Sequence, residues 1–167
     1  MWKITEEKFN KYPSQLKVAK KILELGLCIG KDKKIYCGDV EINLSSLARS
    51  VGIDRRVINS TIDTILKDDE LKQIFTNIEP SGPLLKNIAS ILNLGVIELE
   101  GSGEKYGILG KIAMVLSDAK LSIRQLYASD PELSQVPKIT IITNRPVPGN
   151  LLQELLKIDG ISKVSIY

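Results

Sequence analysis

The alternation of apolar and polar positions predicts a helix and then a hairpin in the first part of the chain. Over residues 14–26, apolar side chains recur at the three- and four-residue spacing of an amphipathic helix. Pro13 favours the start of that helix. Short β-like segments follow at 35–37 and 40–42, and Gly38-Asp39 between them is typical of a tight turn.

Residues 44–66 carry the pattern of two helices joined by a short turn. Ala48 is small enough for two helices to approach closely, and Gly52 permits the positive φ that a tight turn requires. Asp54 is placed to cap the second helix. The following segment, 71–78, is ambiguous and reads as a helical turn followed by a strand.

The second half of the chain changes rhythm to strand, helix, strand, strand, helix, strand. The predicted strands are 95–100, 121–128, 138–143 and 162–167, and the predicted helices are 108–119 and 150–158. This order is that of the ferredoxin-like split βαβ unit. We therefore expect an α+β protein with a mostly helical N-terminal domain and a βαββαβ C-terminal domain.

Pro80-Ser81-Gly82-Pro83 is the clearest break between the two patterns. It predicts an N-terminal domain at 1–79, a linker with a short apolar helix at 80–93, and a C-terminal domain at 94–167. The apolar helix would contain Leu84, Leu85, Ile88, Ile91 and Leu92.

The composition is that of a soluble globular protein, with 43% hydrophobic and 26% charged residues. No stretch approaches the 18 or so apolar residues that span a membrane, and the first residues lack the apolar run of a signal peptide. The two cysteines, Cys28 and Cys37, are too few for a disulfide framework and predict a buried thiol pair. A cytoplasmic protein is expected.

Histidine is absent. Its absence excludes Ser-His-Asp and Cys-His catalysis and every metal site with a histidine ligand. The glycine-rich phosphate-binding motifs are also missing. We therefore expect no catalytic residues, no metal and no cofactor.

Residues 44–59 closely resemble the helix-turn-helix motif and, with the preceding helix and β segments, a winged helix. This resemblance implies that the second helix reads DNA, because arginine and asparagine pair with base edges and serine holds phosphates. Thr61 departs from the motif, which often has an apolar residue there. The candidate DNA contacts are Ser46, Arg55, Arg56, Asn59 and Ser60.

A protein-binding helical domain is the alternative to a DNA reader. Residues 1–79 contain 14 lysines and arginines and 12 acidic residues, so their net charge is only +2. A strong non-specific DNA binder would be more basic.

Three segments of the second half resemble an ACT domain: the strand-to-helix loop 101–109, the strand start 120–125 and the ending 156–167. Tyr106 departs from the proline usual at its position. The resemblance implies two ACT units paired edge to edge, with an amino acid in the seam and its carboxylate at a helix N-terminus. The candidate ligand contacts are Ser102, Gly103, Glu104, Lys105, Tyr106, Gly107, Ile108, Leu109, Ser122 and Ile123.

Taken whole, the chain resembles predicted regulators of amino-acid metabolism that contain an ACT domain, through Asp54-Arg55-Arg56 and residues 130–133. The resemblance implies a homodimeric, ligand-responsive transcriptional regulator that binds DNA and a small effector. Two alternatives stay open. One is an amino-acid sensor that binds a protein partner instead of DNA, and the other, which the missing histidines disfavour, is an enzyme.

Overall fold

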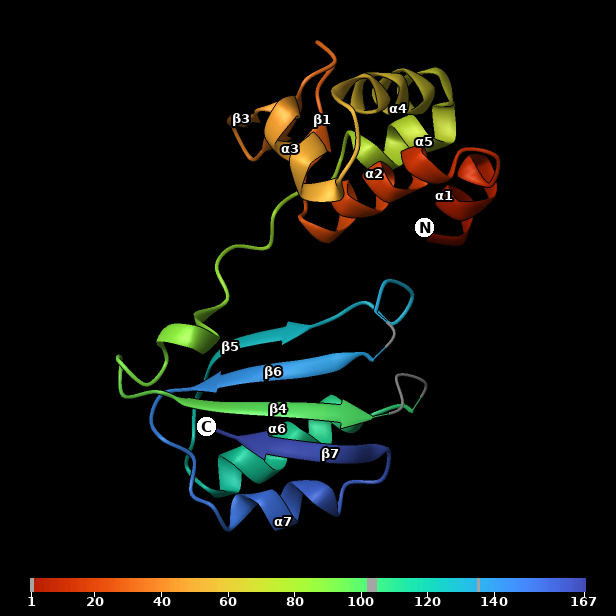
Figure 1. The fold of residues 1–167 in the computed structure, drawn as a ribbon. Coiled ribbons are helices and arrows are strands. Elements are labelled where there is room, and N and C mark those ends of the chain that lie inside the picture. The colour runs from red at the N-terminus through yellow and green to blue at the C-terminus, as the bar shows by residue number, and fades with distance from the viewer. Residues whose placement is uncertain (1, 102–104, 135) are drawn as a thin grey trace. The chain divides into compact units, whose positions relative to one another are not determined.

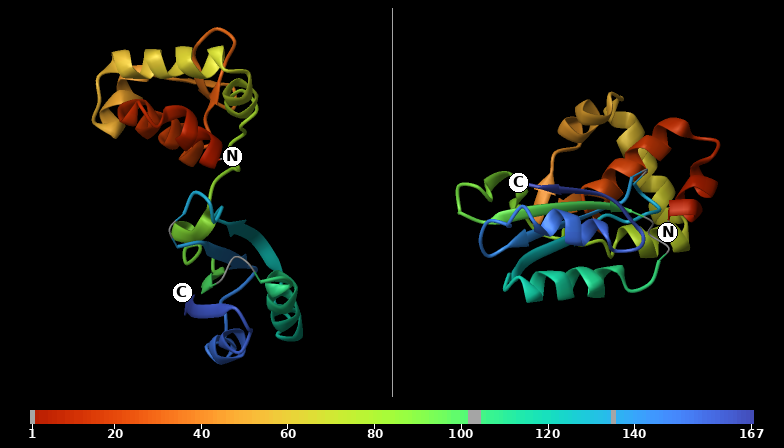
Figure 2. Two further views of the ribbon diagram at one scale, coloured as in Figure 1. Left: turned by 90° about the vertical axis from the view of Figure 1, so that its right-hand side faces the viewer. Right: turned by 90° about the horizontal axis from the view of Figure 1, so that it is seen from below.

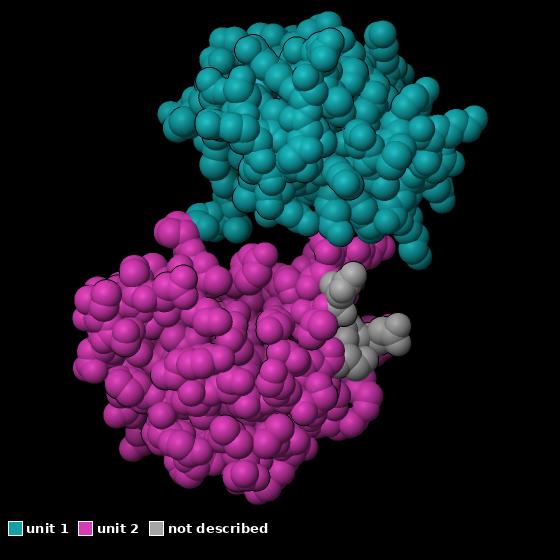
Figure 3. All heavy atoms as spheres, in the orientation of Figure 1, with its two compact units in different colours: residues 1–82 teal, residues 83–167 magenta. Residues whose placement is uncertain are grey.

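The protein consists of two compact units, residues 1–82 and 83–167 (Figures 1 and 3). A computed structural model describes residues 2–101, 105–134 and 136–167. Both units mix helices with an antiparallel sheet, so the predicted α+β class is confirmed. Within the described residues, every helix is too short or too polar to cross a membrane.

Unit 1 is mostly helical and carries a small sheet of order β1-β2-β3. Its helices are α1 (Trp2–Phe9), α2 (Pro13–Glu24), α3 (Leu44–Val51), α4 (Arg55–Lys67) and α5 (Asp69–Phe75). Its strands are β1 (Cys28–Ile29), β2 (Ile35–Cys37) and β3 (Val40–Ile42). The predicted hairpin and paired helices are therefore present. The prediction of a strand at 74–78 is wrong, because α5 continues through Phe75.

The turn between α3 and α4 forms as the sequence predicts. Asn43 caps α3 by accepting hydrogen bonds from the backbone N–H groups of Ser45 and Ser46. Gly52 ends the helix in the left-handed conformation, with φ of +72°. Asp54 then caps α4 by accepting from the Arg56 N–H. Each boundary is thus set by a short-range contact.

The core of unit 1 lies between α2 and α4. Val18 and Ile22 of α2 are fully buried, as are Ile58 and Ile65 of α4. Thr61 is also buried, and its hydroxyl donates to the Val57 carbonyl at 2.7 Å. A threonine therefore replaces an apolar residue there without leaving an unsatisfied polar group.

The two cysteines are only half-buried, which corrects the expectation of a buried pair. Cys28 lies opposite Tyr36 in the register of β1 and β2, so Cys37, the next residue, faces the other side of the sheet. Both thiols are free.

Unit 2 is a four-stranded antiparallel sheet of order β5-β6-β4-β7 with α6 and α7 on one face (Figures 1 and 2). Its elements are β4 (Gly95–Gly101), α6 (Ile108–Asp118), β5 (Ile123–Ala128), β6 (Lys138–Thr143), α7 (Leu151–Leu156) and β7 (Ile161–Ile166). Placing β6 and β4 in the centre confirms the split βαβ topology. Strand β5 lies at the edge of this sheet and pairs only with β6.

The two faces of this sheet differ in chemistry. Ile97, Leu99 and Ile141 pack against the helices in the main core. On the opposite face, the Glu98 carboxylate forms an ion pair with Lys86 Nζ at 2.8 Å, and the Glu100 carboxylate forms one with Lys138 Nζ at 3.0 Å. The face without helices is thus partly closed by paired charges.

The junction before β4 differs from the predicted apolar helix. Only a single 3₁₀ turn, η1 (Leu85–Ile88), forms, and Ile91 beyond it is 80% exposed. The Gln125 side chain of β5 accepts from the Leu85 N–H at 2.9 Å and donates to the Pro83 carbonyl at 2.7 Å. Residues 83–93 therefore belong to unit 2, and the boundary lies at Gly82 rather than across the predicted linker 80–93.

Candidate functional site

The first turn of α4 presents two arginines with different electrostatic surroundings. Arg55 is exposed and pairs with no carboxylate in the described residues. The Arg56 side chain is 90% exposed, but its Nε lies 3.1 Å from Asp54 Oδ1. The hydrogen bond from the Arg56 side chain lowers the pKa of Asp54. Arg55 is therefore the free cation at the tip of the helix, and Arg56 is partly neutralised.

Ser60 contacts α2 rather than standing free for a phosphate. Its hydroxyl donates to the Val57 carbonyl at 3.0 Å and accepts from Gln15 Nε2 at 3.3 Å. The Thr64 hydroxyl lies within donating distance of Gln15 Oε1, at 3.1 Å, and of the Ser60 carbonyl, at 2.8 Å. This network joins α4 to α2, and the exposed Ser60 hydroxyl would donate to a phosphate only by giving up its bond to the Val57 carbonyl. Asn59, one residue earlier, is exposed.

Two further cations lie near the candidate contacts. Arg49, in the last turn of α3, donates from Nη2 to the Ser46 hydroxyl at 3.3 Å, and both residues are exposed. Arg49 and Ser46 are three residues apart on one helix, and this spacing places their side chains next to each other, so the sequence alone indicates the pair. Lys33 of the β1–β2 turn pairs with Asp63 of α4 at 2.6 Å, and this hydrogen bond lowers the pKa of Asp63. Lys33 thus offsets the acidic residue on the exposed face of α4.

The predicted ligand loop of unit 2 is described only in part. Ser102, Gly103 and Glu104 lie outside the described residues. Lys105 Nζ pairs with Asp159 at 2.6 Å, and the Tyr106 side chain is 99% exposed. Gly107 enters α6 with φ of +78° and gives the helix no side-chain cap. The first N–H groups of α6 therefore lack side-chain acceptors and suit an anionic group.

Ser122 and Ile123 lie at the opposite end of the sheet from this loop. The Ser122 N–H donates to Asn144 Oδ1, and Ile123 pairs with Thr143, which lies opposite Gly95 at the start of β4. The ligand loop follows the end of β4, about 20 Å away along a strand of this length. One copy of the chain therefore does not bring the two groups of candidate contacts together.

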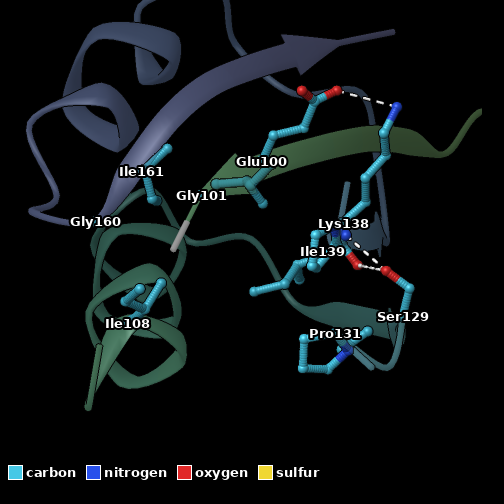
Figure 4. A pocket seen from close by; sticks show the side chains of 12 residues that line it. Glu100, Gly101, Ile108, Ser129, Pro131, Lys138, Ile139, Gly160 and Ile161 are labelled. Atoms are coloured by element: carbon cyan, nitrogen blue, oxygen red, sulfur yellow. Dashed lines mark hydrogen bonds and ion pairs between the residues drawn. The ribbon is translucent and has the colours of Figure 1, made fainter. Parts of the chain in front are cut away.

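A cavity of about 210 Å³ opens beside the start of α6 (Figure 4). Its apolar lining includes Leu99, Ile108, Ala128, Pro131, Ile139 and Ile161. Of the predicted ligand contacts, Ile108 lines it. No local sequence motif indicates this cavity, because its walls come from all four strands or their ends.

The edge of the sheet beside α6 is apolar. Ile123 and Leu126 of β5 are exposed, as are Leu109 and Met114 of α6. The outer side of β5 also presents backbone N–H and C=O groups that no other strand of the sheet pairs with.

No protein-family model matches the chain, and no curated protein matches it. Among solved structures, it is similar to the ACT domain of GTP pyrophosphokinase from Chlorobium tepidum, with 19% identity over 44% of this chain and 96% of that chain and a TM-score of 0.36. It is also similar to an AsnC family transcriptional regulator from Agrobacterium tumefaciens, with 13% identity over 92% of this chain and 86% of that chain and a TM-score of 0.30. A transcriptional regulator from Neisseria meningitidis, solved as a complex with L-Met, is 9% identical over 92% of this chain and 86% of that chain, with a TM-score of 0.27.

Proposed function

We propose that the protein is a homodimeric, ligand-responsive DNA-binding regulator whose effector is an amino acid. The observation that carries the DNA-binding part is the free guanidinium of Arg55 at the exposed first turn of α4, directly after the capped helix-turn-helix bend. That end of the second helix is the part that enters the major groove in proteins of this geometry.

The surroundings of Arg55 fit a DNA contact. Arg49 and Ser46 can approach the phosphate backbone, while Arg55 and Asn59 have the chemistry to pair with base edges. Lys33 offsets Asp63 on the same helix, which removes a charge that would repel phosphates. The contacts proposed for DNA are therefore Ser46, Arg49, Arg55, Arg56 and Asn59.

The ligand-sensing part places the carboxylate of an amino acid at the uncapped start of α6. Pairing of two copies along β5 would complete the seam that Ser122 and Ile123 were predicted to line. The effector would then alter DNA affinity only through its different affinities for the two dimer states.

A gel shift at fixed salt tests the DNA-binding surface. Arg55→Ala should weaken binding to the selected operator at least about fivefold, because a bidentate arginine–base contact contributes about 1–3 kcal/mol. The double change with Arg56→Ala should abolish it. Lys72→Ala on α5, an exposed cation away from α4's first turn, is the matched control and should bind like the wild type. Unchanged binding by the double variant would reject the proposed surface.

A protein partner remains the second candidate, because unit 1 is only weakly basic and Asp68, Asp69 and Glu70 form an acidic segment. Capture of a biosynthetic enzyme by the full chain, without retention of any DNA from a random library, would favour this candidate.

A further inference from the structure

We propose that the cavity beside the start of α6 receives the side chain of the effector, and that the effector is therefore an amino acid with an aliphatic side chain. This inference rests on the proposed ligand-sensing function and adds the ligand class to it. It also adds specificity-determining residues outside the ligand loop, which itself contributes Gly101 and Ile108 to the lining.

The walls of the cavity offer no free polar side chain among the described residues. Leu99, Ile108, Ile139 and Ile161 supply apolar surface from three strands and α6 (Figure 4). The Ser129 hydroxyl is already engaged, since it accepts from the Lys138 N–H at 2.6 Å and donates to the Lys138 carbonyl at 3.2 Å. A polar ligand side chain would lose its bonds to water there without replacement.

The charged residues at the border are also occupied. The Glu100 carboxylate pairs with Lys138 at 3.0 Å and with Lys163 at 3.3 Å. Leu99 faces the helices, so Glu100, the next residue of the strand, directs its side chain to the opposite face of the sheet. The Lys105 ammonium is held by Asp159. A charged ligand side chain would thus find no unpaired opposite charge in this cavity.

Size and position agree with an aliphatic group. An apolar cavity of about 150 Å³ is enough to bind benzene, so 210 Å³ accommodates a leucine-sized side chain. Ile108 is the first residue of α6 and also lines the cavity. A carboxylate bound at the start of α6 therefore places the rest of an amino acid at the mouth of the apolar space.

Isothermal titration of the full-length protein with single amino acids tests the ligand class. Leucine, isoleucine, valine and methionine should bind, and serine, aspartate and lysine should not. Each methylene removed from the side chain should weaken binding about fourfold, the equivalent of about 0.8 kcal/mol per buried methylene. Tighter binding of serine or aspartate than of leucine would overturn the inference.

Ala128→Leu tests the location. Ala128 pairs with Ile139, which faces the helices, so its side chain lies on the cavity side of β5. The larger residue should fill the cavity and weaken leucine binding at least tenfold, with the melting temperature unchanged or raised. Ala128→Ser, which leaves the volume almost unaltered, is the matched control. Wild-type affinity for leucine in a folded Ala128→Leu protein would place the ligand elsewhere.

Ile139→Val provides a second, milder readout should Ala128→Leu fail to fold. The additional space should shift preference from valine toward methionine, and an unaltered order of affinities would contradict the assignment.

The outcomes also separate the two proposals. Binding of polar amino acids alone would overturn this inference and leave a ligand sensor. Binding of none would overturn both the inference and the sensing function, while Arg55-dependent DNA binding would still stand.

Discussion

At the residue scale, two acidic side chains of unit 1 organise helix ends. Asp54 and Asp68 cap α4 and α5, and each also pairs with a cation. The hydrogen bond from Lys8 lowers the pKa of Asp68. A carboxyl whose pKa is lower in the folded state stabilises the protein above its unfolded pKa, near 3.9, and this stability is lost as the pH falls toward the folded value.

Asp68→Ala should therefore destabilise the protein by about 1 kcal/mol at pH 7, mainly through loss of the helix cap. The difference from wild type should shrink as the pH falls below about 4, because the carboxyl of the unfolded chain takes up a proton there, whereas the folded carboxyl stays ionised until a lower pH. Urea unfolding at both pH values measures it. Glu6→Ala, an exposed acid on α1, serves as the control and should change little. A pH-independent difference would contradict the ionic part of this account.

At the scale of elements, edge strand β5 has two roles. One of its side chains, Gln125, holds the segment 83–85 by two hydrogen bonds, while its apolar residues flank α6 at the sheet edge. The junction is therefore ordered by a contact 40 residues away in the chain. Its short 3₁₀ turn could not fold alone, because a single turn does not repay its nucleation cost.

Gln125→Leu should loosen this junction and leave the rest of the sheet intact. Loss of the acceptor for the Leu85 N–H should speed hydrogen exchange at that amide about fivefold, the equivalent of roughly 1 kcal/mol for one hydrogen bond. Exchange measured by NMR should be unchanged for the β4 and β6 amides. Gln153→Leu on the exposed side of α7 is the control. Equal protection of Leu85 in both variants would show that Gln125 does not hold the segment.

At the scale of the whole molecule, the proposed regulator needs two copies. Paired helix-turn-helix units read half-sites roughly 34 Å apart or a multiple of that distance. The apolar edge formed by β5 and α6 is the surface of unit 2 that fits self-association, because it combines exposed apolar side chains with an open strand edge.

Leu126→Lys should prevent dimer formation by placing a charge at that edge, and should weaken binding to an operator with two half-sites far more than binding to one half-site. Sedimentation velocity and gel shift measure the two effects. Leu156→Lys on α7 is a matched control, because Leu126 and Leu156 are both 37% exposed. A dimer that survives Leu126→Lys but not Leu156→Lys would place the interface on α7.

Features that depend on neighbours along the chain can be predicted from the sequence alone. The helix-turn-helix bend follows from Asn43, Gly52 and Asp54, whose contacts reach only a few residues. The succession of strands and helices along unit 2 follows from its hydrophobic periodicity. The hydrophobic pattern does not predict helix α1, because its buried positions are Trp2, Thr5 and Phe9 and a threonine interrupts the apolar stripe.

Which candidate side chains are free depends on contacts between distant parts of the chain. Ser60 is engaged because α2 lies beside it, Arg56 is partly neutralised, and Ser122 lies a strand's length from the loop it was expected to join. The cavity likewise exists only where the ends of several strands meet α6. Short stretches of sequence determine local backbone preferences, whereas charge pairing and enclosed volume depend on contacts between residues far apart in the chain.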